Sequence, residues 1–530
     1  MKLTYESLMC DRRAWEEAGV RLPQFDIAGM AERTIRHPKW IHFGAGNIFR
    51  AFMAKLQQRL LDAGLTDTGV IAAEAFDQEI IDRFYQPYDN LTMLVTLHAD
   101  ARLEKEIIAS IPCAIKAGPH HPELLRMMQD PGLQMISMTI TEKGYALTDL
   151  KGNYLPFIRH DMEAGPQEAT SMMGLCTGLL YHRYTHGAAP LAVVSMDNCA
   201  RNGEKLEAAV ITIAREWLAK GMVEEGFLNY LQNPARITFP WSMIDKITPR
   251  PSEDVRKALQ ELGIEGMTPA MTARHTYSAA FVNAEAPEYL VIEDSFPNGR
   301  PPLEHAHVYF TDRDTVNRTE RMKVTTCLNP LHTALAVYGC LLGYPTIASE
   351  MKDPALRALV EGIGGREGMP VVVHPGILDP EAFLREVLDE RLPNPFMPDT
   401  PERIATDTSQ KIPVRFGETI KAYWPNVDSL HFIPLAIAGW CRYLLGVDDA
   451  LQPMTLSTDP MLEPLQQALA GVRAGQPETY CGQLQSILSN RVIFGSDLTE
   501  SPLAARIEGF FVRMLAGAGA VRRTLEEEVL

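Results

Sequence analysis

Short apolar runs and stretches of helical spacing alternate along the first half of the chain. Residues 39–43 (KWIHF) form an apolar run that leads directly into Gly44-Ala45-Gly46, and apolar residues then recur with the period of a helix over 47–62. A second apolar run follows at 69–76 (GVIAAEAF). The pattern predicts a strand, a turn, a helix and a second strand, which is the βαβ unit of a parallel sheet.

Further runs of strand length continue this alternation. They predict buried strands at 91–97, 135–141 and 191–196, and the segments with helical spacing between them lie at 122–129, 171–186 and 203–220. This order favours an α/β fold, a doubly wound sheet of Rossmann type. The pattern weakens after 236–248, and another strand-like run at 289–293 meets a turn-rich stretch at 296–302.

From about residue 320 onward the spacing is helical in long pieces. Helices are expected at 330–342, 353–363, 380–390, 415–423, 430–445, 460–470 and 501–517. We therefore predict an N-terminal extension over 1–36, a Rossmann-type dinucleotide-binding domain over 37–297 and a mainly helical substrate and catalytic domain over 298–530. The longest apolar stretch, 333–348, is shorter than the roughly 20 residues of a membrane span and indicates a buried helix.

Composition and charge narrow the classes of function. The 530 residues include 46% hydrophobic and 22% charged residues, as in globular proteins. The 50 Lys and Arg against 67 Asp and Glu give a net charge of −17, which disfavours nucleic-acid or membrane partners. The eight scattered cysteines form no Cys-x-x-Cys pair and the N-terminus has no signal-peptide core, so a reduced, cytoplasmic protein is expected.

The turn at Gly44 and Gly46 is the first candidate site. In a dinucleotide fold, glycines let the chain turn tightly and let pyrophosphate approach the N–H groups at the helix start. Here Phe49 stands where the usual fingerprint has its third glycine, but the strand before and the helix after match the required context. Asn47 and Arg50 are candidate phosphate contacts, with a solvated surface charge as the alternative for Arg50.

An acidic residue near the end of the second strand bears on the choice of cofactor. Glu74 is placed to accept hydrogen bonds from the adenosine ribose and to repel a 2′-phosphate, which predicts NAD rather than NADP. Asp77 is a competing candidate for the same role.

A second candidate site lies at residues 321–332 (RMKVTTCLNPLH), just before an apolar helix. Pro330 suits the first turn of that helix. Lys323, Asn329 and His332 then lie near the start of a buried element. On this segment alone, an N-cap asparagine and a core histidine with satisfied hydrogen bonds would explain the pattern equally simply.

Seven segments along the chain resemble, in order, the polyol-specific long-chain dehydrogenase family, which includes mannitol dehydrogenases, fructuronate reductases and tagaturonate reductases. The similarity covers roughly 40–520. The segments are FGAGNIFRAF from 43, SMTITEKGY from 137, SMDNCARNG from 195, FPWSMIDKITP from 239, VIEDSFPNGRP from 291, CLNPLHTALAVYGCLLGY from 327 and RIATDTSQKIP from 403.

The resemblance implies a Rossmann-type domain joined to a helical domain, an active site between the two, and metal-independent catalysis. It assigns the general acid/base to Lys323 and the contacts to the reacting oxygen to Asn198 and Asn329. Substrate-binding roles fall on Arg403, Lys411 and Asp245, and His332 is expected to contact the substrate. A lysine base, amide donors and a nicotinamide together suit oxidation of a secondary alcohol.

One spacing departs from the family pattern. Four residues separate the lysine from the asparagine in the family, whereas five separate Lys323 from Asn329 here, and Val324 stands at the matching position. A one-residue bulge before Pro330 would restore the geometry, so we keep Lys323 as the expected base.

The sequence predicts an NAD-dependent oxidoreductase acting on D-mannonate and D-fructuronate. A polyol dehydrogenase, a tagaturonate reductase and a non-catalytic NAD sensor are the alternatives. A zinc enzyme is disfavoured, because His120-His121 and His305-x-His307 show no recognisable ligand spacing.

Overall fold

The computed structural model describes residues 1–149 and 151–530. The chain forms two compact units, Met1–His98 with Arg102–Asn317, and Arg318–Leu530 with Ala99–Ala101. They are called unit 1 and unit 2 below. The domain limits expected from the sequence, 36/37 and 297/298, stay predictions.

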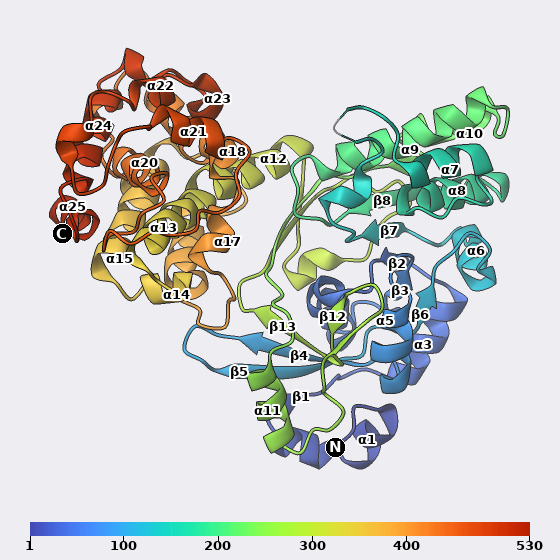
Figure 1. The fold of residues 1–530 in the computed structure, drawn as a ribbon. Helices are drawn as coiled ribbons and strands as arrows, with labels where there is room; N and C mark the ends of the chain where they lie inside the picture. Colours follow the sequence, from blue (N-terminus) through green and yellow to red (C-terminus); the bar gives the residue numbers. More distant parts are fainter. Residues whose placement is uncertain (150) are drawn as a thin grey trace. The chain divides into compact units, whose positions relative to one another are not determined.

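Unit 1 is built on a six-stranded parallel sheet (Figure 1). The sheet order is β6-β3-β2-β7-β8-β9, so the winding reverses between β2 and β7, where dinucleotide folds bind their ligand. The predicted doubly wound, Rossmann-type sheet is confirmed. Its strands are β2 (Trp40–Phe43), β3 (Ile71–Glu74), β6 (Ala114–Lys116), β7 (Met135–Met138), β8 (Leu191–Ser195) and β9 (Ile237–Thr238).

Each face of this sheet has its own hydrophobic core. Ile41 and Phe43 pack with helices on one face, whereas Trp40 packs with helices on the other, as the two-residue period of a strand requires. The first face is covered by α6 (Pro122–Gln129), α7 (Pro156–Ala164), α8 (Met172–Thr185), α9 (Asn202–Ala219) and α10 (Glu225–Gln232). The second is covered by α4 (Ala54–Asp62) and α5 (Glu79–Phe84).

Smaller sheets complete unit 1. The strand predicted at 91–97 is β4 (Thr92–Leu97), but its expected place in the main sheet is wrong: it pairs with β5 (Leu103–Ile108) and β13 (Phe281–Glu285) in a sheet of order β1-β5-β4-β13. Apolar runs do not encode which strands pair. A three-stranded sheet has the order β10-β14-β15, made of β10 (Ser242–Asp245), β14 (Tyr289–Glu293) and β15 (Tyr309–Thr311).

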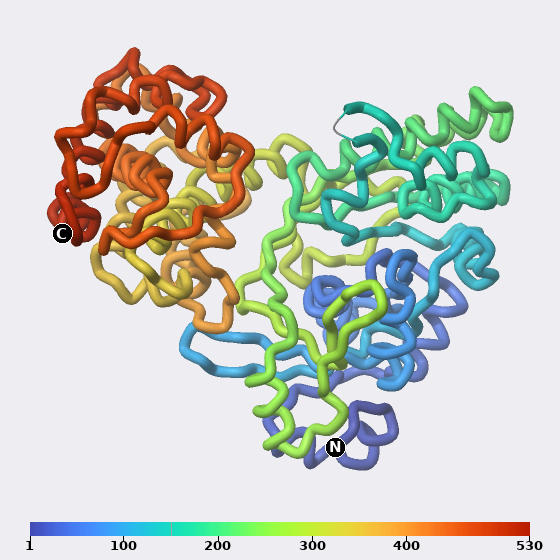
Figure 2. The backbone as a smooth tube through the Cα atoms, in the orientation of Figure 1, coloured from blue at the N-terminus to red at the C-terminus, as the bar shows by residue number. Residues whose placement is uncertain are grey.

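The first 36 residues belong to unit 1, and Figure 2 shows the path of this N-terminal segment in dark blue. Strand β1 (Val20–Arg21) pairs with β5, and the backbone N–H of Glu265 donates to the carbonyl of Met1 at 2.8 Å. The remaining elements are α1 (Tyr5–Cys10), α2 (Arg12–Glu17), α3 (Ile27–Arg36), α11 (Glu253–Glu261), β11 (Ala270–Met271), β12 (Tyr277–Ser278) and α12 (Arg313–Met322), which runs into unit 2.

Unit 2 is helical, as predicted, and is arranged around α13 (Asn329–Leu342). This apolar helix packs against α14 (Ile347–Glu350), α15 (Pro354–Glu361), α17 (Pro401–Ala405), α20 (Phe432–Tyr443) and α25 (Ala520–Val529). The others are α16 (Pro380–Glu386), α18 (Thr408–Ile412), α19 (Glu418–Tyr423), α21 (Leu462–Ala468), α22 (Gln485–Leu488), α23 (Arg491–Phe494) and α24 (Leu503–Met514). Among the described residues, no helix has the length and hydropathy to cross a bilayer.

Candidate functional site

The turn after β2 can be made only with glycine at position 44. Gly44 has a φ of +100°, and a Cβ at this position would stand 2.3 Å from the carbonyl oxygen of Thr139, which follows β7. A side chain is therefore excluded both by the backbone conformation and by the neighbouring strand. This close approach lies at the point where the winding of the sheet reverses.

Gly46 keeps the start of the next helix open. A Cβ at Gly46 would meet no atom within 4 Å, and the N–H groups of a first helical turn have no partner inside the helix. Phe49 is fully buried beneath this turn, with its ring stacked on His42 at 4.5 Å between centroids. The Phe49 side chain thus fills the space that a third glycine would leave between helix and strand.

Arg50 is buried, so the interpretation of this residue as a solvated surface charge is wrong. Its guanidinium donates to the carbonyl of Ala279 at 2.8 Å, to the hydroxyl of Ser278 at 2.7 Å and to Oδ1 of Asn47 at 2.9 Å. Burial lowers the pKa of Arg50. In these contacts Arg50 fixes Asn47 on the first helical turn rather than reaching outward.

Glu74 ties the end of β3 to the turn. Oε2 of Glu74 accepts from the N–H of Ala45 at 2.8 Å, and Oε1 accepts from Phe76 at 2.8 Å and Asp77 at 3.0 Å. Asp77, the competing acid, is buried and accepts a 2.6 Å bond from the hydroxyl of Thr272. Of the two carboxylates, Glu74 is the one directly bonded to the glycine turn.

The loops after β7 and β8 are joined by Asp197, a residue that the sequence analysis did not single out. Its carboxylate accepts from the N–H groups of Ile140 and Thr141, both at 2.8 Å, and from the hydroxyl of Tyr145 at 2.6 Å. Burial raises the pKa of Asp197, although these three hydrogen bonds act to lower it. Asn198, the next residue, is exposed at the carboxyl end of β8. Asp197 is the third residue of the SMDN stretch that contains Asn198, and this position in a family segment was the available signal.

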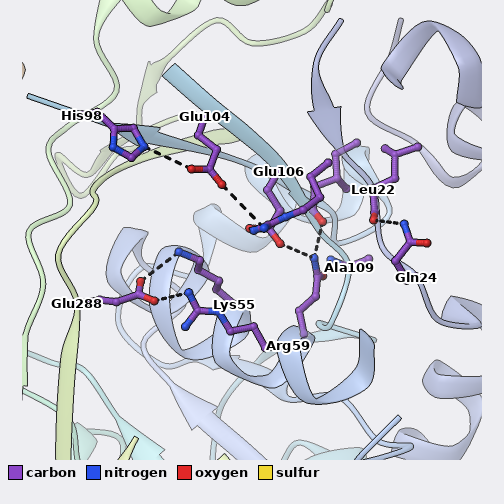
Figure 3. Close-up of polar contacts among 12 residues, drawn as sticks. Leu22, Gln24, Lys55, Arg59, His98, Glu104, Glu106, Ala109 and Glu288 are labelled. Carbon is purple, nitrogen blue, oxygen red and sulfur yellow. Dashed lines mark hydrogen bonds and ion pairs between the residues drawn. The ribbon is translucent and has the colours of Figure 1, made fainter. Parts of the chain in front are cut away.

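Asp245, another candidate, is buried at the end of β10 beside a charged cluster. Glu288 accepts from Nζ of Lys55 at 3.1 Å and Nζ of Lys246 at 3.0 Å, and it pairs with Arg59; Figure 3 shows the Lys55 and Arg59 contacts. Burial alone would raise the pKa of Glu288, but the three cations lower it far below its usual range. Burial lowers the pKa of Lys246 to about 8. The cluster fixes the chain immediately after Asp245.

In unit 2 the predicted bulge before Pro330 is confirmed. Residues Lys323–Cys327 form a π-helical turn, in which the N–H of Leu328 donates to the carbonyl of Lys323 at 3.0 Å. A π turn holds one more residue than an α turn, which accounts for the extra residue between Lys323 and Asn329. Lys323 is buried.

This turn lies among other π-helical turns of unit 2. It packs against Gly362–Gly368 and Pro413–Gly417, and these two segments also contact α13. A further π turn is Val387–Arg391. Such turns are rare and occur mostly at functional positions, so their gathering near the start of α13 supports a site there.

The structure brings His332 and Arg403 together at Asp399, and Lys411 lies close enough to both to act on them electrostatically. Arg403 pairs with Oδ1 of Asp399, and Nε2 of His332 lies 3.4 Å from Oδ2 of the same residue. Lys411 donates to the carbonyl oxygen of Ile404 at 3.0 Å, and burial followed by repulsion from Arg415 lowers the pKa of Lys411 to about 8. The substrate-binding pair expected eight residues apart thus lies beside His332.

His332 is neutral in this setting. Burial and repulsion from four cations, Arg415, Arg391, Arg403 and Lys411, lower the pKa of His332 to about 3. Its Nε2 makes no hydrogen bond with any described residue. A neutral imidazole with an unused nitrogen is suited to contact a ligand hydroxyl. Arg391 and Arg415 were missed from the sequence; Arg415 follows Lys411 by one helical turn, which was the available signal.

Comparison with known proteins decides the family. Residues 38–305 match the mannitol dehydrogenase Rossmann domain, and residues 315–511 match the mannitol dehydrogenase C-terminal domain. The chain belongs to the mannitol dehydrogenase family. The resemblance inferred from its seven sequence segments is therefore confirmed, and the chain is an oxidoreductase of this family.

Relatives in the family carry different names. A D-mannonate oxidoreductase of Thermotoga maritima is 53% identical over 100% of this chain and 99% of its own length. A mannitol 2-dehydrogenase of Neosartorya fischeri is 30% identical over 86% of each chain. The solved structure of mannitol 2-dehydrogenase from Pseudomonas fluorescens, a ternary complex with NAD and D-mannitol, matches with a TM-score of 0.69 and 26% identity over 99% of each chain.

Proposed function

We propose that the protein is an NAD-dependent oxidoreductase that interconverts D-mannonate and D-fructuronate. The observation that carries the proposal is the cationic surrounding of His332, where Arg403, Lys411 and Arg415 face a neutral imidazole and Arg403 already engages Asp399. Such a group of cations suits a substrate that carries a carboxylate. The D-mannonate oxidoreductase relative, 53% identical over the whole chain, supports the same substrate pair.

The residues of unit 1 fit a dinucleotide. Gly46 leaves open space at a helix start, Gly44 lets the strands approach closely, and Glu74 stands at the end of β3, where an acid disfavours a 2′-phosphate. The mannitol 2-dehydrogenase relative whose structure contains NAD supports this cofactor. When bound, NAD supplies the nicotinamide that accepts or donates the hydride.

The remaining chemistry is assigned to side chains of the protein. Lys323 takes the hydroxyl proton during oxidation and returns it during reduction, while the amides of Asn198 and Asn329 donate to the reacting oxygen. His332 donates to a neighbouring hydroxyl, and Asp245 accepts from another. Arg403 and Lys411 hold the acid end of the substrate.

A substrate panel tests the proposal. With NADH, D-fructuronate should be reduced faster, by kcat/KM, than D-tagaturonate and D-fructose when absorbance at 340 nm is followed, and D-mannonate should be oxidised in the reverse direction. Tight NADH binding with no turnover of any member would contradict the proposal and favour an NAD sensor.

A polyol dehydrogenase is the second candidate. The observation in its favour is the 30% identity to a mannitol 2-dehydrogenase. A higher kcat/KM for D-fructose than for D-fructuronate in the same panel would favour the polyol dehydrogenase.

A further inference from the structure

The guanidinium of Arg415 has no acidic partner in the part of the chain that the structure describes. It extends from the π turn Pro413–Gly417, and its Nη1 donates to the hydroxyl of Thr333 at 2.7 Å and to the carbonyl of Asn329 at 3.4 Å. Nε and Nη2 make no hydrogen bond with the described residues, so one edge of the fork is unused. Burial lowers the pKa of Arg415 to about 10, which leaves it charged at neutral pH.

The neighbouring charges do not compensate Arg415. Asp399 is engaged by Arg403, and Lys411 is itself a cation that repels Arg415. A partly buried cation without a counter-ion is costly to a fold. An anionic ligand would remove that cost, and the planar fork of an arginine matches a carboxylate with two parallel hydrogen bonds.

The position of Arg415 relates it to the other candidate residues. The two groups that hold Nη1 are the carbonyl of Asn329 and the hydroxyl of Thr333, both on the first turns of α13. His332 lies on the same turns, and among the cations Arg415 is the strongest influence on the His332 pKa. The guanidinium is thus fixed on one side while its Nε–Nη2 edge remains available for a ligand.

We propose that Arg415 determines specificity for acids by binding the substrate carboxylate through Nε and Nη2, with Thr333 and Asn329 holding Nη1. The inference rests on the proposed function and deepens it, because it names the residue that separates sugar acids from neutral polyols. Arg403 and Lys411 then contact the acid end of the substrate beside Arg415. A neutral substrate would leave the charge of Arg415 uncompensated.

The test compares an acid with its neutral counterpart. For wild type, Arg415→Gln and Arg415→Lys, kcat and KM are measured for D-fructuronate and for D-fructose. In Arg415→Gln the ratio of kcat/KM for the acid to kcat/KM for the ketose should fall about 10- to 100-fold, mainly through a higher KM for the acid, since a charged hydrogen-bonded contact is lost. Arg415→Lys, which keeps charge but not the fork, should fall in between.

Two further variants separate binding from folding. Thr333→Val keeps Arg415 but removes its acceptor, so the acid-to-ketose ratio should fall about threefold to tenfold. Arg491→Gln, at an exposed arginine of unit 2 paired with Glu500, is the matched control and should leave the ratio unchanged. If circular dichroism shows that Arg415→Gln is not folded, the acid-to-ketose ratio of Arg415→Lys decides whether Arg415 binds the acid.

The outcomes distinguish this inference from the proposed function. If wild type does not turn over the sugar acid, the proposed function is wrong and this inference is overturned with it. If wild type reduces the acid but the Arg415 variants lose acid and ketose activity in equal proportion, Arg415 is structural and only this inference is overturned.

Discussion

The carboxylate of Glu74 and the backbone N–H of Ala45 are 2.8 Å apart, which joins the end of β3 to the glycine turn that follows the neighbouring strand β2. Because the same carboxylate also accepts from Phe76 and Asp77, it is held in one orientation at the carboxyl end of β3. A negative charge fixed in this way shapes the turn, and by the proposed assignment it would set the electrostatic environment of a ribose bound there.

Cofactor preference follows from this placement. NADH should be used at least tenfold more efficiently than NADPH, because a fixed carboxylate facing a 2′-phosphate costs about 1 to 3 kcal/mol. Kinetics with both cofactors at saturating substrate measure the ratio. Glu74→Gln should narrow it and also weaken NADH binding, since the amide group disturbs the contact to Ala45. Equal efficiency of the wild type with both cofactors would contradict the role of Glu74.

Replacement of Lys323 should remove chemistry. In Lys323→Ala, kcat should fall by at least about 10³, the scale of general acid/base catalysis plus the lost charge. NADH affinity, measured by fluorescence titration, should be nearly unchanged, because Gly44 and Gly46 belong to unit 1. Added methylamine should restore part of the rate. Val324→Ala is the matched control, and a Lys323→Ala enzyme within tenfold of wild type would exclude Lys323 as the base.

The pH dependence of substrate binding should report Lys411. The pKa of Lys411 is lowered to about 8, so the charge is present below pH 8 and is lost as pH rises through that value. The KM for D-fructuronate should therefore rise about threefold to tenfold between pH 7 and pH 9, when about 90% of the side chain is neutral. Lys411→Arg, which stays charged, should flatten this rise. A flat wild-type profile would show that Lys411 does not bind the acid.

The Glu288 cluster predicts a large effect on stability. Glu288→Gln leaves Lys246, Lys55 and Arg59 without their shared carboxylate, and breaking a buried ion pair costs about 3 to 5 kcal/mol of unfolding free energy. Urea unfolding measures the change. Glu304→Gln, which removes an exposed pair with Arg300, should cost less than about 1 kcal/mol. Similar losses of unfolding free energy in Glu288→Gln and Glu304→Gln would contradict a special stabilising role of the Glu288 cluster.

Chelation should leave turnover intact. The proposed groups that act on the reacting oxygen are Lys323, Asn198 and Asn329, none of which needs a Lewis acid. Activity after prolonged dialysis against EDTA or phenanthroline should match that of the untreated enzyme. Loss of activity that zinc restores would disprove the lysine mechanism.

Local patterns in the sequence were sufficient for the strand, turn and helix around Gly44, because a short apolar run, glycines and helical spacing are all contained within about 25 residues. The pairing of β4 with β13 was not predictable, since the partner lies almost 190 residues away and apolar runs do not specify it. The burial of Arg50, which rules out a solvated surface charge, was not predictable for the same reason. Its partners Ser278 and Ala279 are distant in sequence, and arginines are usually exposed.

In unit 2, the only candidate site residues that could be predicted were those that lie within the segments resembling the family. Arg403, Lys411 and His332 lie in those segments. A one-residue bulge before Pro330 was inferred from the excess in spacing, and the structure shows it as the π turn Lys323–Cys327. Arg415 lies two residues beyond the quoted motif, and its significance depends on burial and on the lack of an acid partner among the described residues. Neither property can be seen in a single sequence.

The π turn at Lys323–Cys327 has a consequence for how this family can vary. An α-helix advances by about 100° per residue, and a π turn takes up one inserted residue while the residues on either side keep their helix faces. Deleting one residue from this turn would convert it to regular helix and leave Lys323 on the face that it occupies now. A sequence with the shorter spacing can therefore present its lysine in the same direction, and the functional position is defined by the helix face rather than by the residue count.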